Sequence, residues 1–254
     1  MKKYDGFLID LDGTMYRGTE QIHEAVDFVK RLKEEGHPYL FVTNNSTRTK
    51  EQVADKLIEF GVPAEPGQVL TTSMATAQFI KNEKPDATVY FIGEIGLKQA
   101  LSESGLTYEE NEPDYVVIGM DRDINYEKLA KACLAVRKGA KFLSTNPDIA
   151  LPTERGFLPG NGSLTSVVSV STTIDPLFIG KPEPIIVEQA LKTIGTAKDK
   201  TLMIGDNYNT DILAGLRAGV DTLLVHTGVT TREAMVNERK QPTFALDSLS
   251  EWVF

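Results

Sequence analysis

The chain has 254 residues, 41% of them hydrophobic and 25% charged, a composition that excludes a disordered or fibrous protein and allows one large domain or two ordinary ones. Its net charge of −9 argues against a nucleic-acid partner, because the chain as a whole repels polyanions. No apolar run approaches the ~18–20 residues of a membrane span, and the single cysteine, Cys133, excludes a disulfide framework. The N-terminal segment carries acids and no long apolar region, so we expect a cytoplasmic protein with no membrane partner.

Short apolar runs of strand length alternate along the chain with segments of helical periodicity. Between the first two runs, for example, apolar residues recur at helical spacing from Ile22 to Leu32, and Gly36 follows as a helix end. This alternation predicts an α/β fold with a largely parallel sheet. The apolar runs lie at 7–9, 39–42, 89–92, 115–118, 142–143, 177–179, 202–204 and 222–225.

Four of these runs lead directly into polar residues. Because the carboxyl ends of parallel strands meet at one edge of a sheet, we expect the four polar groups to share one site. They are Asp10, Asp12 and Gly13 after the first run, Thr43, Asn44 and Asn45 after the second, Lys181 after the run at 177–179, and Asp206 with Asp211 after the run at 202–204.

Carboxylates gathered at one edge repel one another unless a cation or a proton neutralises them. Oxygen ligands suit a hard ion, and Mg²⁺ is the usual choice where a phosphate shares the coordination. Lys181 adds a positive charge and Thr43 a hydroxyl donor. A carboxylate nucleophile, a metal, a lysine and a hydroxyl together favour phosphoryl transfer.

The four segments resemble the four motifs of the haloacid dehalogenase (HAD) superfamily of phosphatases. They read DLDGT at 10–14, VTNN at 42–45, GKP at 180–182 and GDNYNTD at 205–211, and their spacing is most similar to the NagD-like branch with a type C2 cap. The resemblance implies a phosphoric monoester hydrolase that uses Mg²⁺ and forms a phospho-aspartate. Its substrates would be small-molecule phosphate esters.

The resemblance also implies a role for each motif residue. Asp10 would be the nucleophile, and Asp12 the general acid and then the base. Gly13, Thr43, Asn44 and Lys181 would bind the phosphoryl group. Mg²⁺ would be held by Asp10, the backbone carbonyl of Asp12, and Asp206, with Asp211 close behind unless it only caps the following helix.

The spacing of the motifs predicts an inserted domain. Thr43 and Lys181 are 138 positions apart, whereas one strand–helix repeat of a parallel sheet takes roughly 30–40 residues. We therefore expect a Rossmann-like parallel-sheet HAD core at 1–81 plus 177–254, and a smaller α/β cap domain at 82–176. Such a cap excludes water and contacts the substrate. A homodimer formed through the cap is a further implication of the resemblance.

Substrate selectivity has its candidates in the segment 144–163, which is rich in Pro, Gly, Asn and Thr and is predicted to be a loop. Asn146, Asp148 and Arg155 lie in it. Arg155 is its only cation and suits an anionic substrate, because guanidinium binds carboxylate in a bidentate fork, unless it is only paired with a nearby acid. Sugar or acid-sugar phosphates are favoured, with pyridoxal phosphate and nucleoside monophosphates as alternatives.

Three other functions are alternatives to the hydrolase. A phosphoryl-accepting signalling module also combines acids, a Thr and a Lys on a parallel sheet, but it is about half this length and lacks the inserted segment. A phosphomutase and a non-catalytic binder of phosphate esters are the others. Sustained release of phosphate distinguishes the hydrolase from the signalling module, which would be phosphorylated once.

Overall fold

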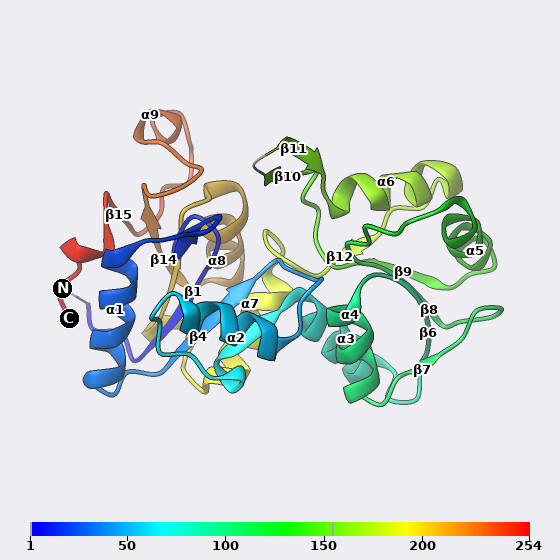
Figure 1. Ribbon diagram of the computed structural model, residues 1–254, viewed down its shortest axis with the longest axis horizontal. Helices are drawn as coiled ribbons and strands as arrows, with labels where there is room; N and C mark the ends of the chain where they lie inside the picture. Colours follow the sequence, from blue (N-terminus) through cyan, green and yellow to red (C-terminus); the bar gives the residue numbers. More distant parts are fainter. Residues whose placement is uncertain (1, 154) are drawn as a thin grey trace. The chain divides into compact units, whose positions relative to one another are not determined.

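The computed structural model describes residues 2–153 and 155–254, which form two compact units. The first unit comprises the chain up to Thr43 together with Lys50–Leu70 and Lys181–Phe254. The second comprises Asn44–Thr49 and Thr71–Gly180. In Figure 1 the blue and red ends of the ribbon belong to the first unit, and the green middle of the chain belongs to the second.

The first unit is built on a six-stranded sheet in the order β15-β14-β13-β1-β4-β5. The pairings of β1 with β13 and β4, and of β14 with β13 and β15, are parallel. The strands are β1 (Gly6–Ile9), β4 (Tyr39–Thr43), β5 (Val69–Thr71), β13 (Thr201–Gly205), β14 (Asp221–Val225) and β15 (Phe244–Leu246), with a separate ribbon of β2 (Tyr16–Arg17) and β3 (Glu20–Gln21). Every residue of β1, β4 and β13 is buried, which is why these strands read as continuous apolar runs.

The helices of the first unit cover this sheet. They are α1 (His23–Glu34), α2 (Lys50–Glu59), α7 (Pro184–Ile194), α8 (Leu213–Ala218) and α9 (Arg232–Met235), with short turns η1 (Pro66–Gln68), η2 (Lys198–Lys200), η3 (Tyr208–Ile212) and η4 (Leu249–Glu251). The apolar stripe of α1, which includes Phe28 and Leu32, packs in one core cluster with Phe7 and Ile9 of β1. The predicted helix at 22–32 is thus present.

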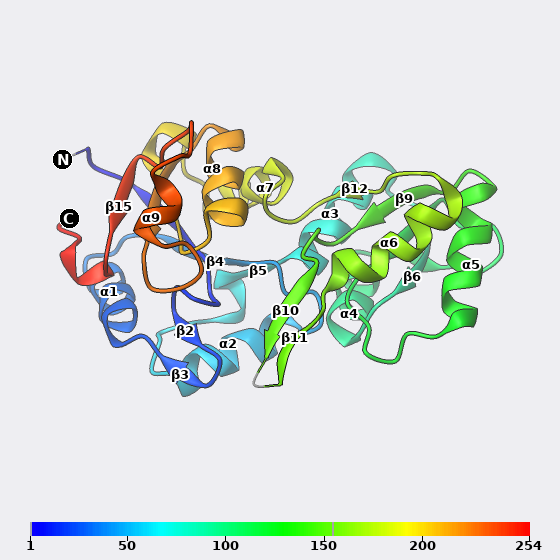
Figure 2. The ribbon, with the colours of Figure 1, turned by 90° about the horizontal axis from the view of Figure 1, so that it is seen from above.

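The second unit has its own parallel sheet, in the order β12-β9-β8-β6-β7. The elements are α3 (Thr72–Glu83), β6 (Thr88–Ile92), α4 (Ile95–Glu103), β7 (Thr107–Tyr108), β8 (Tyr115–Ile118), α5 (Tyr126–Arg137), β9 (Lys141–Ser144), β10 (Ala150–Thr153), β11 (Gly156–Pro159), α6 (Asn161–Thr172) and β12 (Leu177–Phe178). β10 and β11 form an antiparallel ribbon, seen near the middle of Figure 2.

Helices cover both faces of this second sheet. Val89 of β6 and Val117 of β8 share a core cluster with α3 and α4, whereas Tyr90 and Val116 share one with α5 and α6. Alternate residues of a strand face opposite sides, so α4 and α5 lie on opposite faces. The predicted α/β fold with parallel sheets is confirmed.

The unit boundaries differ from the predicted division at residues 82 and 176. Ala77 and Ile80 of α3 pack in the same core cluster as Leu97 and Leu101 of α4, so the whole helix belongs to the second unit. At the other end β12 pairs with β9, which places residues 177–180 in the second unit as well.

The segment 144–163 is not the continuous loop that its Pro and Gly content predicts. It contains β10 and β11, and α6 begins at Asn161. Pro152 and Pro159 lie in these strands because a two-stranded ribbon leaves edge positions where no backbone donor is needed. Across the described residues, no helix combines the length and apolarity that crossing a bilayer requires.

Candidate active site

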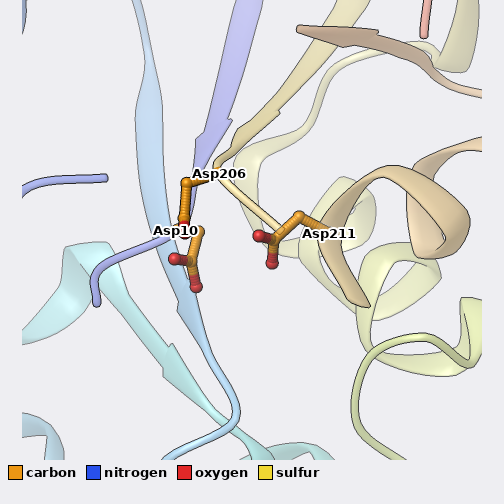
Figure 3. A group of neighbouring side chains, drawn as sticks. All are labelled: Asp10, Asp206 and Asp211. Carbon is orange, nitrogen blue, oxygen red and sulfur yellow. The ribbon is translucent and has the colours of Figure 1, made fainter. Parts of the chain in front are cut away.

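Three buried aspartates converge at the carboxyl edge of the first unit's sheet (Figure 3). Asp10 follows β1 and Asp206 follows the neighbouring strand β13, whereas Asp211 lies in η3, a single π-helical turn. Each offers a carboxylate oxygen within 4.8 Å of those of the other two. A set of charged oxygen donors this close together fits a hard divalent cation.

The ammonium group of Lys181 lies against two of these acids. Nζ donates to Asp10, lies 2.7 Å from Oδ1 of Asp211, and donates to the carbonyl of Val42 at 3.0 Å. Lys181 is buried and comes from the segment that joins β12 to α7. The prediction that all four polar segments end strands of one sheet is therefore wrong for Lys181, because β12 belongs to the other sheet.

Burial and mutual repulsion dominate the electrostatics of this cluster. Burial, followed by the charge of Asp211, raises the pKa of Asp10 well above its ordinary value, although Lys181 opposes the shift. The same two causes raise the pKa of Asp206 to about 6. Burial lowers the pKa of Lys181, but the charges of Asp10 and Asp211 outweigh it and hold that pKa above its ordinary value. Lys181 therefore compensates the three carboxylates only in part, and a bound cation would supply the missing positive charge.

Hydrogen bonds from two residues outside the predicted set hold Asp206 in place. Its Oδ2 accepts from the backbone N–H of Val229 at 2.6 Å, and its Oδ1 accepts from the hydroxyl of Thr14 at 3.3 Å. Thr14 is buried and also donates to Oδ2 of Asp10 at 3.4 Å. It lies within the DLDGT segment but was given no role of its own.

The loop that follows β14 approaches Asp206 very closely. A Cβ atom at Gly228 would overlap Oδ2 of Asp206, so this position requires a glycine. Thr227 donates from its hydroxyl to the carbonyl of Gly13 at 2.7 Å. This loop was not among the predicted site segments, although the polar residues that follow the apolar run at 222–225 were a signal for it.

Three other predicted residues lie at the same sheet edge. Thr43 is buried at the end of β4, the strand next to β1. Asp12 is exposed, and its Oδ2 accepts from the hydroxyl of Tyr16 at 3.4 Å. Gly13 adopts φ +90°, and a Cβ there would overlap Asp206. Its N–H donates to the carbonyl of Tyr16 at 2.8 Å. The backbone therefore bends at Gly13, in a conformation that glycine adopts readily because it has no side chain.

Asn44 belongs to the second unit, where it contacts two of the predicted specificity residues. Its Nδ2 donates to Asp148 at 3.1 Å, and its backbone carbonyl accepts from Nδ2 of Asn146 at 2.8 Å. Asn146 is buried, and its own carbonyl accepts from Asn161 at 2.7 Å. These contacts tie the segment after Thr43 to the start of the β9–β10 connection.

Arg155 lies apart from this network. It is exposed at the turn between β10 and β11, where its backbone N–H donates to the hydroxyl of Thr153 at 3.2 Å. Of the three predicted specificity residues, the structure therefore links Asn146 and Asp148 to Asn44 but does not link Arg155 to either.

Comparison with known families gives two matches. The profile described as haloacid dehalogenase-like hydrolase matches residues 7–107, and one described as HAD-hydrolase-like matches residues 178–252. The two matches contain all of the residues of the acidic cluster together with Lys181.

Individual proteins resemble the chain over its whole length. The 5'-nucleotidase YutF of Bacillus subtilis is 64% identical over 253 residues, 100% of this chain and 99% of that protein. An acid sugar phosphatase of Staphylococcus haemolyticus is 54% identical and covers 98% of this chain and 95% of its own. The structure of NagD from Escherichia coli K-12 matches with a TM-score of 0.94 at 30% identity, over 99% of both chains.

Proposed function

Because the chain belongs to the haloacid dehalogenase-like hydrolases, we propose that it is a Mg²⁺-dependent phosphatase of small phosphate monoesters that acts through a phospho-aspartate at Asp10. The observation that carries the proposal is the position of Asp10, a buried carboxylate held by Lys181 beside Asp206 and Asp211. Relatives named for phosphatase and nucleotidase activity support the reaction class.

Mg²⁺ fits the donor set because the ammonium of Lys181 does not balance the negative charge of the three buried carboxylates. Asp10 and Asp206, with the backbone carbonyl of Asp12, would hold the ion, and Asp211 lies within reach as a further oxygen donor. When bound, the ion supplies positive charge that stabilises the phosphoryl oxygens in the transition state.

The chain's own residues carry the two chemical steps. An oxygen of Asp10 attacks phosphorus, the bond from phosphorus to the ester oxygen breaks, and Asp12 gives its proton to the leaving alkoxide. Asp12 then takes a proton from water, whose oxygen attacks phosphorus and breaks the bond to Asp10. Exposure of the Asp12 carboxyl supports this role, since it leaves the group accessible to a leaving group and to water.

Lys181 and Thr43 complete the phosphoryl site in this proposal. Lys181 donates to Asp10, opposes the rise of its pKa, and brings a fixed positive charge to the attacking side. Thr43 offers a hydroxyl from the neighbouring strand, and Asn44 an amide beyond it. Gly13 has no side chain, so the Asp206 carboxylate can lie against its backbone. None of these groups recognises the part of the substrate that is esterified to the phosphate.

Acid-sugar phosphates are the substrates that we favour, with a nucleoside monophosphate as the second candidate. A relative named acid sugar phosphatase supports the first, and a more similar relative named 5'-nucleotidase supports the second. Pyridoxal phosphate is a third alternative from the sequence. The cap role of the second unit, the cytoplasmic location and the homodimer stay predictions.

The test is a rate comparison across substrates at equal concentration, with Mg²⁺ present. An acid-sugar phosphate, its neutral sugar analogue, a nucleoside monophosphate and pyridoxal phosphate are each assayed for released orthophosphate, with Asp10→Asn as the blank. The proposal expects repeated turnover with the highest kcat/KM on the acid sugar. A single stoichiometric phosphorylation would instead indicate the signalling module, and a nucleotide preference would select the second candidate.

A further inference from the structure

The second unit contains a cavity of about 500 Å³ beside β6 and β7. This volume lies in the range of sites for small organic ligands. The lining residues come from β6, β7, α4, α5 and the loop after β8, and none of them belongs to the acidic cluster of the first unit. The cavity is therefore a separate feature that the phosphatase chemistry does not use.

The cavity lies where the connections of the second sheet change sides. β6 is followed by α4 on one face, whereas its neighbour β8 is followed by α5 on the other face. In open α/β sheets, ligands bind outside the carboxyl ends of strands at such a switch point. Phe91 and Gly93 at the end of β6, and Asp121 after β8, line the cavity as this rule predicts.

One side of the cavity is an open sheet edge. β7 has only two residues, which pair with Thr88 and Val89, while β6 continues to Ile92. The carbonyl of Val89 faces β7 and accepts from Glu109, and the carbonyl of Ile92 faces β8 and accepts from Gly119. By alternation, the peptide groups of Phe91 face the open side, where β7 has ended.

The lining combines an apolar floor with positive charge at the rim. Val89, Leu101 and Leu106 are buried and form the floor. Lys98 is exposed on α4, and Ser102 follows one helical turn later on the same side. Among the described residues, Lys98 takes part in no ion pair that would neutralise it.

Asp121 does not make this rim negative. Its carboxylate is 4% exposed and lies 2.7 Å from Nζ of Lys128, which also lines the cavity. Glu110 accepts from the hydroxyl of Tyr108 at 2.8 Å, and its charge is balanced by Lys131, whose Nζ lies 2.6 Å from Oε2 of Glu110. Two lysines and one aspartate in the lining leave one net positive charge, in a chain whose total is −9.

From these observations we propose that the cavity binds a small organic anion, with its acidic group at Lys98 and Ser102 and its apolar body on Val89 and Leu101. An ammonium beside a hydroxyl binds a sulfonate, carboxylate or phosphate through charge-assisted hydrogen bonds. The buried floor supplies apolar contact area, which a simple inorganic ion would not use.

The test uses 8-anilinonaphthalene-1-sulfonate as the probe, because this aromatic anion matches the cavity and has no phosphate ester to hydrolyse. It is titrated into the full chain and followed by fluorescence and calorimetry. The wild type is expected to bind one equivalent saturably. Lys98→Glu, which reverses the charge at the rim, and Ser102→Trp, which fills the rim from an exposed position, are each expected to weaken binding about tenfold or more.

Lys192→Glu on α7 is the matched control, since it makes the same charge change at an exposed site of the first unit and should bind within about twofold of the wild type. Equal thermal midpoints of the variants show that each one folds. Asp10→Asn should also bind the probe normally, and orthophosphate should not displace it. The proposal would be overturned if the wild type did not bind the probe, or if Lys98→Glu and Ser102→Trp bound it as tightly as the wild type. Displacement of the probe by orthophosphate would overturn it as well. Each outcome is independent of whether the phosphatase reaction is correct.

Discussion

Nζ of Lys181 lies 2.7 Å from Oδ1 of Asp211, and both side chains are only 2% exposed. The same ammonium also contacts Asp10, so one cation serves two buried carboxylates. Asp206, the third acid, takes its hydrogen bonds from Val229 and Thr14 instead. Three carboxylates and one ammonium leave two negative charges without compensation when all groups are ionised.

This imbalance predicts that Mg²⁺ stabilises the folded protein, as measured by the thermal midpoint. At a concentration about 100 times its dissociation constant, an ion that binds only the folded state adds about 2.7 kcal/mol. That corresponds to a rise of about 5–10 °C for a chain of this size. Asp206→Asn should remove the rise, whereas Asp55→Asn, which removes an exposed carboxylate from α2, should keep it.

The stabilisation by Mg²⁺ should also depend on pH, in a direction that follows from the pKa of Asp206. Burial and the charge of Asp211 raise the pKa of Asp206 to about 6, so the folded state binds a proton that the unfolded state has lost. Without Mg²⁺, this group therefore makes the protein more stable as pH falls from 7 toward 5. The gain from Mg²⁺ should shrink over the same interval, because the proton competes with the ion. A gain that stays constant from pH 7 to pH 5 would contradict Asp206 as a ligand.

Replacement of Asp10 by Asn should abolish turnover without unfolding the protein. An amide is a poor nucleophile, and loss of an essential nucleophile costs orders of magnitude in rate. Lys181 keeps Asp211 and the carbonyl of Val42 as partners, so the thermal midpoint without metal should not fall. Turnover above about a tenth of the wild-type value in a phosphate-release assay would exclude a covalent phospho-aspartate at this position.

Asp12→Asn should separate the acid–base role from metal binding. The Asp12 side chain is exposed and outside the buried cluster, so the Mg²⁺-induced shift of the thermal midpoint should persist. Hydrolysis of alkyl phosphates should fall by about 10²–10⁴-fold, the usual value of general acid–base help. The loss should be smaller for p-nitrophenyl phosphate, whose leaving group needs little protonation. An equal loss on both esters would argue against Asp12 as the leaving-group acid.

Much of the core of this site could be predicted from the sequence because its side chains follow buried strands. β1, β4 and β13 are buried on both faces and read as apolar runs, and the residue that ends or follows each strand is polar. The strand order then brings Asp10, Thr43 and Asp206 to neighbouring positions at one edge.

What the sequence did not reveal depends on backbone groups and tertiary packing. Val229 acts through its N–H, which every residue other than proline carries, and Gly228 acts by lacking a side chain. The assignment of α3 to the second unit follows from its packing on α4, and no local pattern records that contact. β10 and β11 contain Pro and Gly, which composition alone reads as loop.

Gly228→Ala tests the loop after β14 as a support for Asp206. A Cβ at this position would displace the carboxylate of Asp206, so the apparent affinity for Mg²⁺ should fall about 10–100-fold, the usual cost of disturbing a group that positions a metal ligand. The rate should recover in part at high Mg²⁺ concentration. Gly67→Ala is the control, because a Cβ there meets open space. Equal effects of the two substitutions would show that the loop does not position the ligand.

Arg155 should contribute to the choice of substrate. Its exposed position at the turn of the β10–β11 ribbon leaves the guanidinium available to an anionic substrate. If it binds a carboxylate of an acid-sugar phosphate, Arg155→Ala should lower kcat/KM for that ester about tenfold or more, because a charge-assisted fork is lost. The neutral analogue should be hydrolysed as before. Arg122→Ala is the control, since Arg122 is an exposed arginine of the second unit already paired with Glu94 at 2.8 Å. An equal loss on the acidic and neutral esters would show that Arg155 does not recognise the carboxylate, and the preference for acid sugars would then have to come from other residues.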